Sequence, residues 1–226
     1  MHQPLSLPLS RTAALFIDLQ EEHRKDERLL SVGYDKVIAN VARLQGGARA
    51  ARIRLFHFAY VVDVDAATTR AFHPKLSDGR SAFSDKDDPL IAICPEVAPR
   101  DDEPLVVKTQ ASAFGGGLGD ELKANGVEWL VIAGVWTEAC VDATVKDALT
   151  QDFRVLLVKD ACGSGSIAMH RTGILNLANR LYGGAVCDTD AACRLLAGET
   201  VPAWSPRSPV PIRYEAETID LIYDTI

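Results

Sequence analysis

The sequence predicts an α/β protein in which helices cover both faces of a parallel β-sheet. Two observations lead to this prediction. Short apolar runs, such as residues 13–17 (AALFI) and 129–133 (WLVIA), end at a polar residue or a glycine, which is typical of strands buried on both faces. Longer segments with apolar residues at helical spacing separate these runs, and such strand–helix–strand units form right-handed crossovers in a parallel sheet.

The expected elements alternate along most of the chain. Runs rich in apolar, β-branched or aromatic residues predict six strands, at 13–17, 53–62, 105–107, 129–133, 155–158 and 185–187. Helical periodicity predicts helices at 34–51, 120–125, 137–151 and 167–182. The polar segment 63–103 lies between the second and third strands, and a loop of that length is usually functional or contains short elements.

The composition excludes several classes of protein. The chain has 226 residues, of which 47% are hydrophobic and 24% charged, so it can bury a sizeable core and is not a disordered chain. Its net charge of −7 argues against nucleic acid as a partner, because phosphate binding needs a basic surface. Neither a signal peptide nor an apolar run of membrane-spanning length is present, so we expect a cytoplasmic protein without a membrane partner.

We expect one domain, residues 1–197, followed by a C-terminal arm, residues 198–226. The segment 201–211 contains four prolines and the segment 219–226 (IDLIYDTI) is apolar again, so the end of the arm must be buried somewhere. The arm could fold back on its own domain or reach a neighbouring subunit, and we favour the neighbour. The chain is therefore expected to form a homo-oligomer, a dimer or a tetramer.

Three residues that can carry chemistry follow strands of the predicted sheet. Asp18 comes directly after the first strand, Lys108 after the third, and Cys140 lies at the start of the helix that follows the fourth. Ligands of open parallel sheets bind beyond the carboxyl ends of the strands, so these side chains should meet at one edge. Each residue alone has a plain structural explanation, as a turn residue, a solvated cation or a packing residue. Their convergence favours chemistry.

An acid, a cation and a thiol together suit acyl transfer. The thiolate is the nucleophilic form of cysteine, and we expect the helix start and the charge of Lys108 to lower the pKa of Cys140. Asp18 can take the thiol proton and later return it to a leaving amine. Backbone N–H groups at the helix start would face the oxyanion that forms on the substrate.

The same three segments resemble the isochorismatase-like cysteine hydrolases, a superfamily that includes nicotinamidases, N-carbamoylsarcosine amidohydrolases and biuret hydrolases. Residues 134–144 (GVWTEACVDAT) are similar to the nucleophile motif of the family. ALFIDLQ resembles its first strand, with the aspartate at Asp18, and KTQASAF resembles its lysine segment, with the lysine at Lys108. The resemblance covers about residues 12–195 in the family's order. It implies a three-layer, Rossmann-like, doubly wound fold with a six-stranded parallel sheet in the order 3-2-1-4-5-6.

The resemblance also implies roles for individual residues. Asp18, Lys108 and Cys140 would form the catalytic triad. A cis peptide bond between Val135 and Trp136 would turn the Trp136 N–H toward the substrate, where it forms an oxyanion hole with the N–H of Cys140. We further expect five side chains to bind substrate in a small, largely closed pocket, namely Gln20, His23, Phe72, Phe114 and Trp136.

A metal site is not expected. Nicotinamidase-like members of the superfamily carry an Asp-x-His metal motif after the second strand, whereas this sequence has Asp63 and Asp65 there. His57 lies inside a predicted strand, and His73 stands alone in the long polar segment. A metal site needs several converging ligands, so we predict neither a metal nor another cofactor.

The sequence therefore predicts a cysteine hydrolase that cleaves a C–N bond of a small amide, ureide or imide through a thioester. Cys140 together with Lys108 favours this chemistry, because isochorismatases proper hydrolyse a vinyl ether without needing a cysteine nucleophile. Two alternatives stay open. One is vinyl-ether hydrolysis of the isochorismatase type, and the other is a non-catalytic protein of the same fold that uses the three residues as a ligand pocket.

Overall fold

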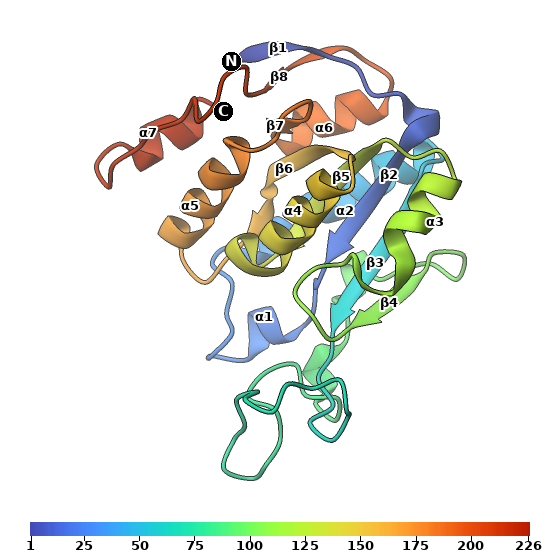
Figure 1. Ribbon diagram of the computed structural model, residues 1–226, viewed down its shortest axis with the longest axis vertical. Helices are drawn as coiled ribbons and strands as arrows, with labels where there is room; N and C mark the ends of the chain where they lie inside the picture. The colour runs from blue at the N-terminus through green and yellow to red at the C-terminus, as the bar shows by residue number, and fades with distance from the viewer.

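The computed structural model describes residues 1–226 and contains one mixed β-sheet of eight strands. The strands lie in the order β1-β8-β7-β6-β5-β2-β3-β4 (Figure 1). Their bounds are β1 His2–Leu5, β2 Thr12–Ile17, β3 Arg54–Tyr60, β4 Leu105–Lys108, β5 Trp129–Val135, β6 Arg154–Gly163, β7 Ala185–Cys187 and β8 Val201–Trp204. The neighbouring strands from β7 to β4 in this order pair in parallel, whereas β8 pairs antiparallel with both β7 and β1.

The sheet has eight strands instead of the predicted six, because two proline-containing segments pair at one edge. In the antiparallel pair of β1 and β8, Pro4 lies opposite Pro202. Proline has no N–H to donate, so it is confined to edge or poorly paired positions of a sheet. β8 meets β7 through the single residue pair of Val186 and Trp204, so the sheet does not depend on the missing N–H groups.

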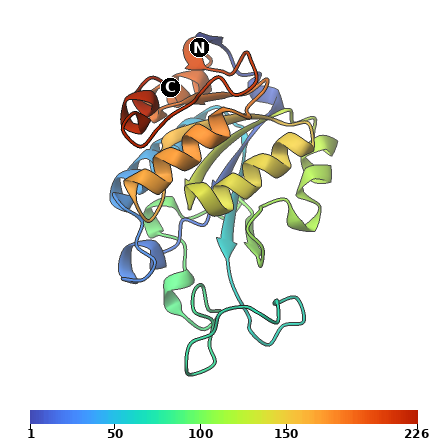
Figure 2. The ribbon, with the colours of Figure 1, turned by 60° about the vertical axis from the view of Figure 1, so that its left-hand side comes forward.

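Helices cover both faces of the sheet (Figures 1 and 2). Their bounds are α1 Glu22–Lys25, α2 Tyr34–Ala50, α3 Leu118–Ala124, α4 Asp142–Thr150, α5 Ile167–Ala178, α6 Thr189–Leu196 and α7 Ile219–Asp224. α2 and α6 pack on one face, and α3, α4 and α5 pack on the other. Each face of the sheet has its own hydrophobic core. Along β2, Phe16 packs in the core under α2 and α6 and Leu15 in the core under α3, α4 and α5, which explains why this strand is continuously apolar. None of the helices is both long and apolar enough to cross a membrane.

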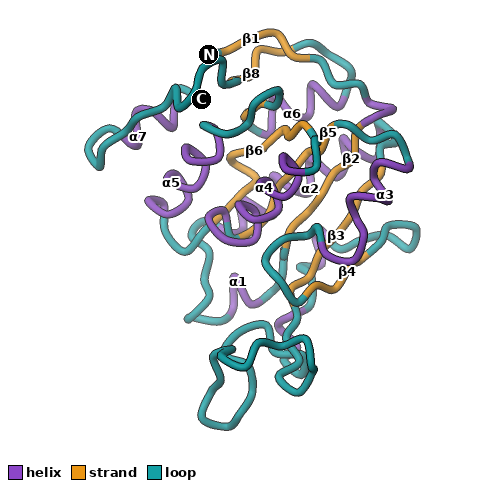
Figure 3. The backbone as a smooth tube through the Cα atoms, in the orientation of Figure 1, coloured by secondary structure: helices purple, strands orange, loops and turns teal.

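The segment between β3 and β4 forms a long loop beyond the carboxyl ends of the parallel strands (Figure 3). It contains two 3₁₀ helices, Pro89–Ile91 and Pro95–Val97. An isolated β-bridge between Gln20 and Ile93 ties it to the segment after β2, and another between Val62 and Asp85 connects the start of the loop to its middle. The loop therefore returns to the sheet edge at which the predicted chemistry-bearing residues end.

The C-terminal arm folds back on its own chain, contrary to the expectation that it reaches a neighbouring subunit. Its first part is β8, and α7 packs beside α5 (Figure 1). Ile212 and Ile226 are buried in the core on the α5 side. Lys159 Nζ donates hydrogen bonds to the backbone carbonyls of Tyr223, at 3.0 Å, and of Ile226. Residues 198–226 are thus an integral part of the domain.

Gly134 allows the ends of β2 and β5 to approach closely. Its φ is +134°, and a Cβ atom at this position would lie 2.1 Å from the backbone oxygen of Ile17. Gly134→Ala should lower the free energy of unfolding by about 3 kcal/mol or more, because the clash is with backbone and cannot be relieved by a rotamer change. Urea denaturation followed by circular dichroism measures this loss.

Gly46 provides a matched control on α2. It is exposed, and an added Cβ atom would meet nothing within 4 Å. Gly46→Ala should stabilise the protein by about 1 kcal/mol, because alanine has the higher helix propensity. A Gly134→Ala variant as stable as the wild type would show that the close approach of β2 and β5 is not required.

Candidate active site

Three side chains from different strand ends meet beyond the sheet. Asp18 follows β2, Lys108 is the last residue of β4, and Cys140 lies in the π-helical turn Thr137–Val141 after β5. Lys108 Nζ lies 2.8 Å from Asp18 Oδ2, and the two side chains are 4% and 3% exposed. The thiol of Cys140 lies close enough to Asp18 to influence its pKa. The sheet edge thus holds a buried ion pair beside a thiol.

The backbone of Asp18 turns sharply at the end of β2. Its φ is +51°, a left-handed conformation that costs a residue other than glycine about 1–2 kcal/mol. Two hydrogen bonds hold the turn, from the Asp18 N–H to Phe58 O at 3.0 Å and from the Gln20 N–H to Asp18 O at 2.9 Å. Such strain persists where the surrounding structure enforces it, and it is common at functional sites.

Lys108 is a cation with a fixed position. Its Nζ donates hydrogen bonds to the backbone carbonyls of Gln110, at 3.1 Å, and Ala111, at 2.9 Å. It also lies 4.7 Å from the centre of the Tyr60 ring, a favourable position for a cation. Because an ammonium group has three donors, these two carbonyls and the carboxylate of Asp18 account for all of them.

The carboxylate of Asp18 is arranged as a proton acceptor. Burial raises its pKa above the usual 3.8, against the opposing effects of Lys108 and Cys140. Besides the Lys108 ammonium, which lies 2.8 Å from Oδ2, and the thiol of Cys140, no side chain occupies the carboxylate oxygens of Asp18. A buried carboxylate with an unused acceptor position and a raised pKa is well suited to take a proton from a neighbour.

Cys140 does not have the lowered pKa that its place in the sequence predicts. Burial and the charge of Asp18 raise the pKa of the thiol to about 12, and Lys108 opposes this only in part. The sequence argument considered a helix start and a lysine, but it did not consider that the site is buried and that Lys108 is already paired. The resting site therefore holds a neutral thiol beside an ion pair.

The turn that carries Cys140 starts at Trp136, and the peptide bond between Val135 and Trp136 is cis. Trp136 O accepts hydrogen bonds from the N–H groups of Ala139, at 3.0 Å, and Val141, at 3.2 Å. The second of these bonds spans five residues and makes the turn π-helical, a feature that often occurs at functional sites. The N–H of Trp136 itself makes no hydrogen bond within the protein, so it is available to a ligand.

A chain of hydrogen bonds connects this turn to the C-terminal arm. Thr137 Oγ1 donates to Gly163 O at 2.9 Å and lies 2.8 Å from His170 Nδ1, while His170 Nε2 lies 3.0 Å from Tyr223 Oη. Since the threonine proton goes to Gly163, His170 must donate from Nδ1 and accept from Tyr223 at Nε2. Burial lowers the pKa of His170 to about 4, in agreement with a neutral ring.

A cavity of about 310 Å³ opens beside Asp18 and Cys140. Its lining is mostly apolar and consists of Asp18, Glu22, His23, Leu29, Tyr60, Phe83, Ser84, Ala111, Val135, Trp136, Ala139 and Cys140. An apolar cavity with a few converging polar groups is typical of a site for a small molecule.

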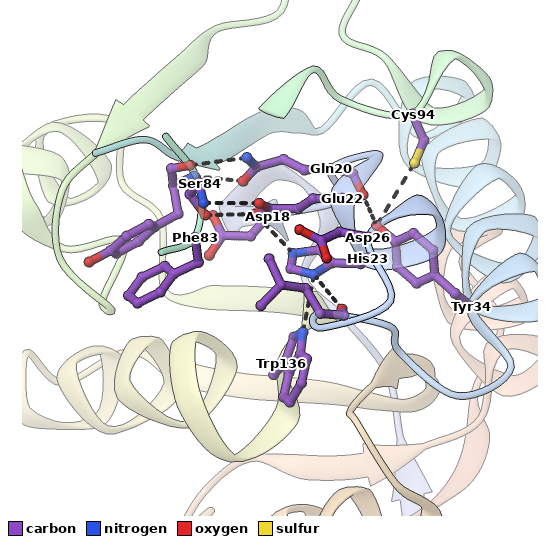
Figure 4. Close-up of polar contacts among 12 residues, drawn as sticks. Asp18, Gln20, Glu22, His23, Asp26, Tyr34, Phe83, Ser84, Cys94 and Trp136 are labelled. Carbon is purple, nitrogen blue, oxygen red and sulfur yellow. Dashed lines mark hydrogen bonds and ion pairs between the residues drawn. The ribbon is translucent and has the colours of Figure 1, made fainter. Parts of the chain in front are cut away.

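The polar groups on the α1 side of the cavity form a small network (Figure 4). Glu22 accepts hydrogen bonds from the Ser84 hydroxyl, at 2.6 Å, and from the Ser84 N–H, at 3.0 Å. His23 Nδ1 accepts from Trp136 Nε1 at 3.2 Å. Both Glu22 and His23 are buried, and burial raises the pKa of Glu22 and lowers that of His23 to about 4.

The structure places two of the five expected substrate-binding residues, His23 and Trp136, in the lining of the cavity. The side chain of Gln20 instead bridges the N–H and C=O groups of Tyr60, at 2.8 and 3.0 Å, so it fixes β3 and lies outside the lining. Phe72 is 80% exposed on the long loop. Phe114 packs against Phe153 in the core, with 5.8 Å between ring centres.

Sequence reasoning missed most of the lining. Phe83 and Ser84 belong to the long polar segment, where no periodicity indicates which residues turn inward. Only the position of Glu22, between the expected substrate-binding residues Gln20 and His23, could have indicated that it lies near the site. A glutamate after a strand is ordinarily exposed, but Glu21 and Glu22 are both buried, and nothing in the sequence indicated that Glu22 lines the cavity and Glu21 does not.

The residues weighed as metal ligands are engaged elsewhere. Asp63 pairs with Lys86 at 2.9 Å, His73 lies 2.7 Å from Ser81 Oγ, and His57 lies 2.9 Å from Glu103. Nowhere in residues 1–226 do three or more His, Cys, Asp or Glu side chains gather as a metal site requires.

Comparison with known proteins identifies the family of this chain. The family model for the isochorismatase domain matches residues 12–191. The chain belongs to the isochorismatase family. A crystal structure of a cysteine hydrolase from Pseudomonas syringae pv. phaseolicola shares the fold, with a TM-score of 0.75 and 21% identity over 87% of this chain and 99% of that one.

Two curated relatives are named as amidohydrolases. The ureidoacrylate amidohydrolase of Variovorax paradoxus is 28% identical, with 88% of this chain and 86% of that protein covered. The maleamate amidohydrolase of Pseudomonas putida is 35% identical over 49% of this chain and 53% of that protein. Relatives of this chain thus hydrolyse C–N bonds, according to their names.

The raised pKa of Cys140 has a measurable consequence. The rate of its alkylation by iodoacetamide should keep rising beyond about pH 9, because the thiolate reacts and little of it exists at neutral pH. Mass spectrometry of the Cys140 peptide over a pH series measures this rate.

Asp18→Asn is the matched control for this titration. Removal of the adjacent negative charge should move the inflection to lower pH, because Asp18 helps to raise the pKa of Cys140. An inflection below about pH 7 in the wild type would mean that the resting site holds a thiolate, which contradicts the raised pKa of Cys140.

Proposed function

We propose that the protein hydrolyses a C–N bond of a small amide, ureide or imide through a thioester on Cys140. The observation that carries the proposal is the buried Asp18–Lys108 pair, which lies beside a thiol in a cavity of small-molecule size. The names of the amidohydrolase relatives support the same bond type.

In the first step, the thiol proton moves to Asp18 as the sulfur attacks the carbonyl carbon. The raised pKa of Asp18 favours this transfer, because the carboxyl group gains by becoming neutral in a buried site. The fixed cation of Lys108 then faces a thiolate instead of a carboxylate, so the net charge of the group is unchanged. This coupling overcomes the high pKa of the resting thiol.

The attack places a negative charge on the former carbonyl oxygen. The N–H groups of Trp136 and Cys140 are proposed to hold this oxyanion, and the unused N–H of Trp136 supports this assignment. When the C–N bond breaks, Asp18 returns its proton to the nitrogen, and the amine or ammonia leaves. An acyl group remains on Cys140 as a thioester.

Water completes the reaction. Asp18, ionised again, removes a proton from a water molecule as the water attacks the thioester carbonyl. The tetrahedral intermediate collapses, the sulfur takes the proton back from Asp18, and the carboxylic acid or carbamic acid is released. Every step uses groups of this chain and water, so the proposal includes no metal or other cofactor.

We also propose that the enzyme works in the cytoplasm as a homo-oligomer, a dimer or a tetramer. All five cysteines are unpaired, as in proteins of reducing compartments. Because the C-terminal arm is folded on its own chain, a subunit contact would not need an exchange of arms between subunits.

Replacement of the nucleophile tests the proposal directly. Cys140→Ala should reduce turnover of any amide or ureide substrate at least about 10⁴-fold, because attack by sulfur is lost, and Cys140→Ser should do nearly the same. Assays on amides, ureides and isochorismate, with mass spectrometry to trap the acyl group on Cys140, measure the effect.

The same panel separates the alternatives. Isochorismate turnover that survives Cys140→Ala would establish the vinyl-ether reaction and refute the proposal. Binding of an amide without turnover or acylation would indicate a ligand-binding protein on the same fold.

The pH profile reports the state of Asp18. Activity needs the ionised carboxylate, so kcat/KM should fall on the acid side around the pKa of Asp18, which burial places above 3.8. The fall of kcat/KM should therefore occur at higher pH than an ordinary aspartate would give. Glu22→Gln, which removes the other carboxyl group of the cavity, should show the same fall, because the titrating group is Asp18. A kcat/KM that stays constant down to about pH 4 would contradict the raised pKa.

The hydrogen-bond chain from the C-terminal arm is expected to position the turn that carries Cys140. Tyr223→Phe removes the donor to His170 Nε2. It should lower kcat about 3–10-fold with little change in KM, since one neutral hydrogen bond is worth about 1 kcal/mol. Thr225→Ala, at an exposed hydroxyl of the same arm, is the control and should leave kcat unchanged. Equal kcat values for the wild type and Tyr223→Phe would show that the arm does not position the turn.

A further inference from the structure

The cavity contains one carboxylate that the proposed reaction does not use. Glu22 lines it, its side chain is 6% exposed, and Ser84 donates to both of its oxygens. The two donors of Ser84, one on each oxygen, favour the ionised form of Glu22 and oppose the burial that raises its pKa. Ser84 leaves each oxygen with a further acceptor position. Glu22 therefore presents unused acceptor capacity to a ligand.

No cation neutralises Glu22. Lys108 is paired with Asp18 and has its remaining donors on backbone carbonyls. Arg24, on the same short helix, binds Glu21 and Glu96. No arginine or lysine is among the residues that line the cavity. Arg70 lines a second hollow on the other side of Tyr60 and Phe83, so it is not among the residues that line the cavity with Glu22.

His23 is neutral and supplies a donor next to this acceptor. His23 Nδ1 lies 3.2 Å from Trp136 Nε1, which can only donate, and 3.3 Å from Leu29 O, which can only accept. The shorter contact with the indole N–H assigns Nδ1 as the acceptor, so the proton of the neutral ring is placed on Nε2. His23 Nε2 lies 3.8 Å from Glu22 Oε1, which is too far for a hydrogen bond between them. The donor of His23 and the acceptor of Glu22 therefore lie side by side in the lining of the cavity, and both are available to a ligand (Figure 4).

From this arrangement we infer that Glu22 and His23 form a specificity site for uncharged or cationic substrates that carry an N–H group, and that Glu22 excludes substrates with a carboxylate. The substrate class rests on the proposed function, whereas the exclusion of anions does not. With Asp18 and Lys108 paired and His23 neutral, Glu22 gives the cavity one negative charge in excess. A second anion in this apolar cavity would meet a like charge without a partner.

Two alkylating reagents of equal size test the charge selection without knowledge of the substrate. Iodoacetamide and iodoacetate both form a thioether with cysteine and release iodide, and they differ only in carboxamide against carboxylate. The rate of alkylation by iodoacetamide divided by that by iodoacetate is compared at Cys140 and at Cys193, a half-buried thiol on α6. This ratio should be about 30-fold or more higher at Cys140, because a like charge in a low-dielectric site repels the anion. Peptide mass spectrometry measures both sites in one sample.

Glu22→Gln should reduce this ratio at Cys140 about tenfold, because the side chain keeps its shape but loses its charge. Glu21→Gln is the matched control, since Glu21 is also buried but pairs with Arg24 and Lys25 outside the cavity. Equal ratios at Cys140 and Cys193, no change with Glu22→Gln, or an equal change with both variants would each overturn the inference.

Turnover by the unmodified enzyme provides a second test that needs no variant. Maleamide should be hydrolysed with a higher kcat/KM than maleamate, and 3-ureidoacrylamide with a higher kcat/KM than ureidoacrylate. A preference for the acids, with an acyl group trapped on Cys140, would overturn the charge selection and leave the proposed function intact. The expected alkylation ratios without acylation by any amide would uphold the charge selection and count against the proposed function.

Discussion

The ion pair between Asp18 and Lys108 is the interaction on which the rest of the site depends. Removing two charges from water is costly, and a buried pair is stable only when its geometry is good and its remaining donors are satisfied. The carbonyls of Gln110 and Ala111 and the ring of Tyr60 supply this environment for Lys108. β2, β3 and β4 must therefore end in register, which the parallel sheet provides.

The pair also affects the protonation of Cys140, the proposed nucleophile. A lysine whose charge is already paired stabilises a neighbouring thiolate only in part, so Cys140 stays protonated until Asp18 accepts its proton. In the proposed reaction, this arrangement links thiolate formation to the attack on substrate. It also limits oxidation of the resting enzyme, because susceptibility to oxidation follows thiolate character.

The residues proposed to react and those that shape the cavity come from different parts of the chain. Asp18, Lys108 and Cys140 stand at or just after the ends of regular strands, whereas Phe83 and Ser84 reach the cavity from the long loop. Loops tolerate sequence change better than strands do, so a family can keep its chemistry while the loop adapts the cavity to a substrate. In this chain the loop contributes Ser84, which holds the Glu22 carboxylate in place.

The sequence by itself determined the parallel sheet and the convergence of Asp18, Lys108 and Cys140, because strand periodicity and strand ends are local properties of the chain. Tertiary structure decided what depends on distant neighbours. Phe83 rather than Phe114 lines the cavity, since the direction of a loop side chain is set by packing. The thiol pKa rises because burial outweighs the helix start and the lysine, and burial arises only when distant segments close around the site.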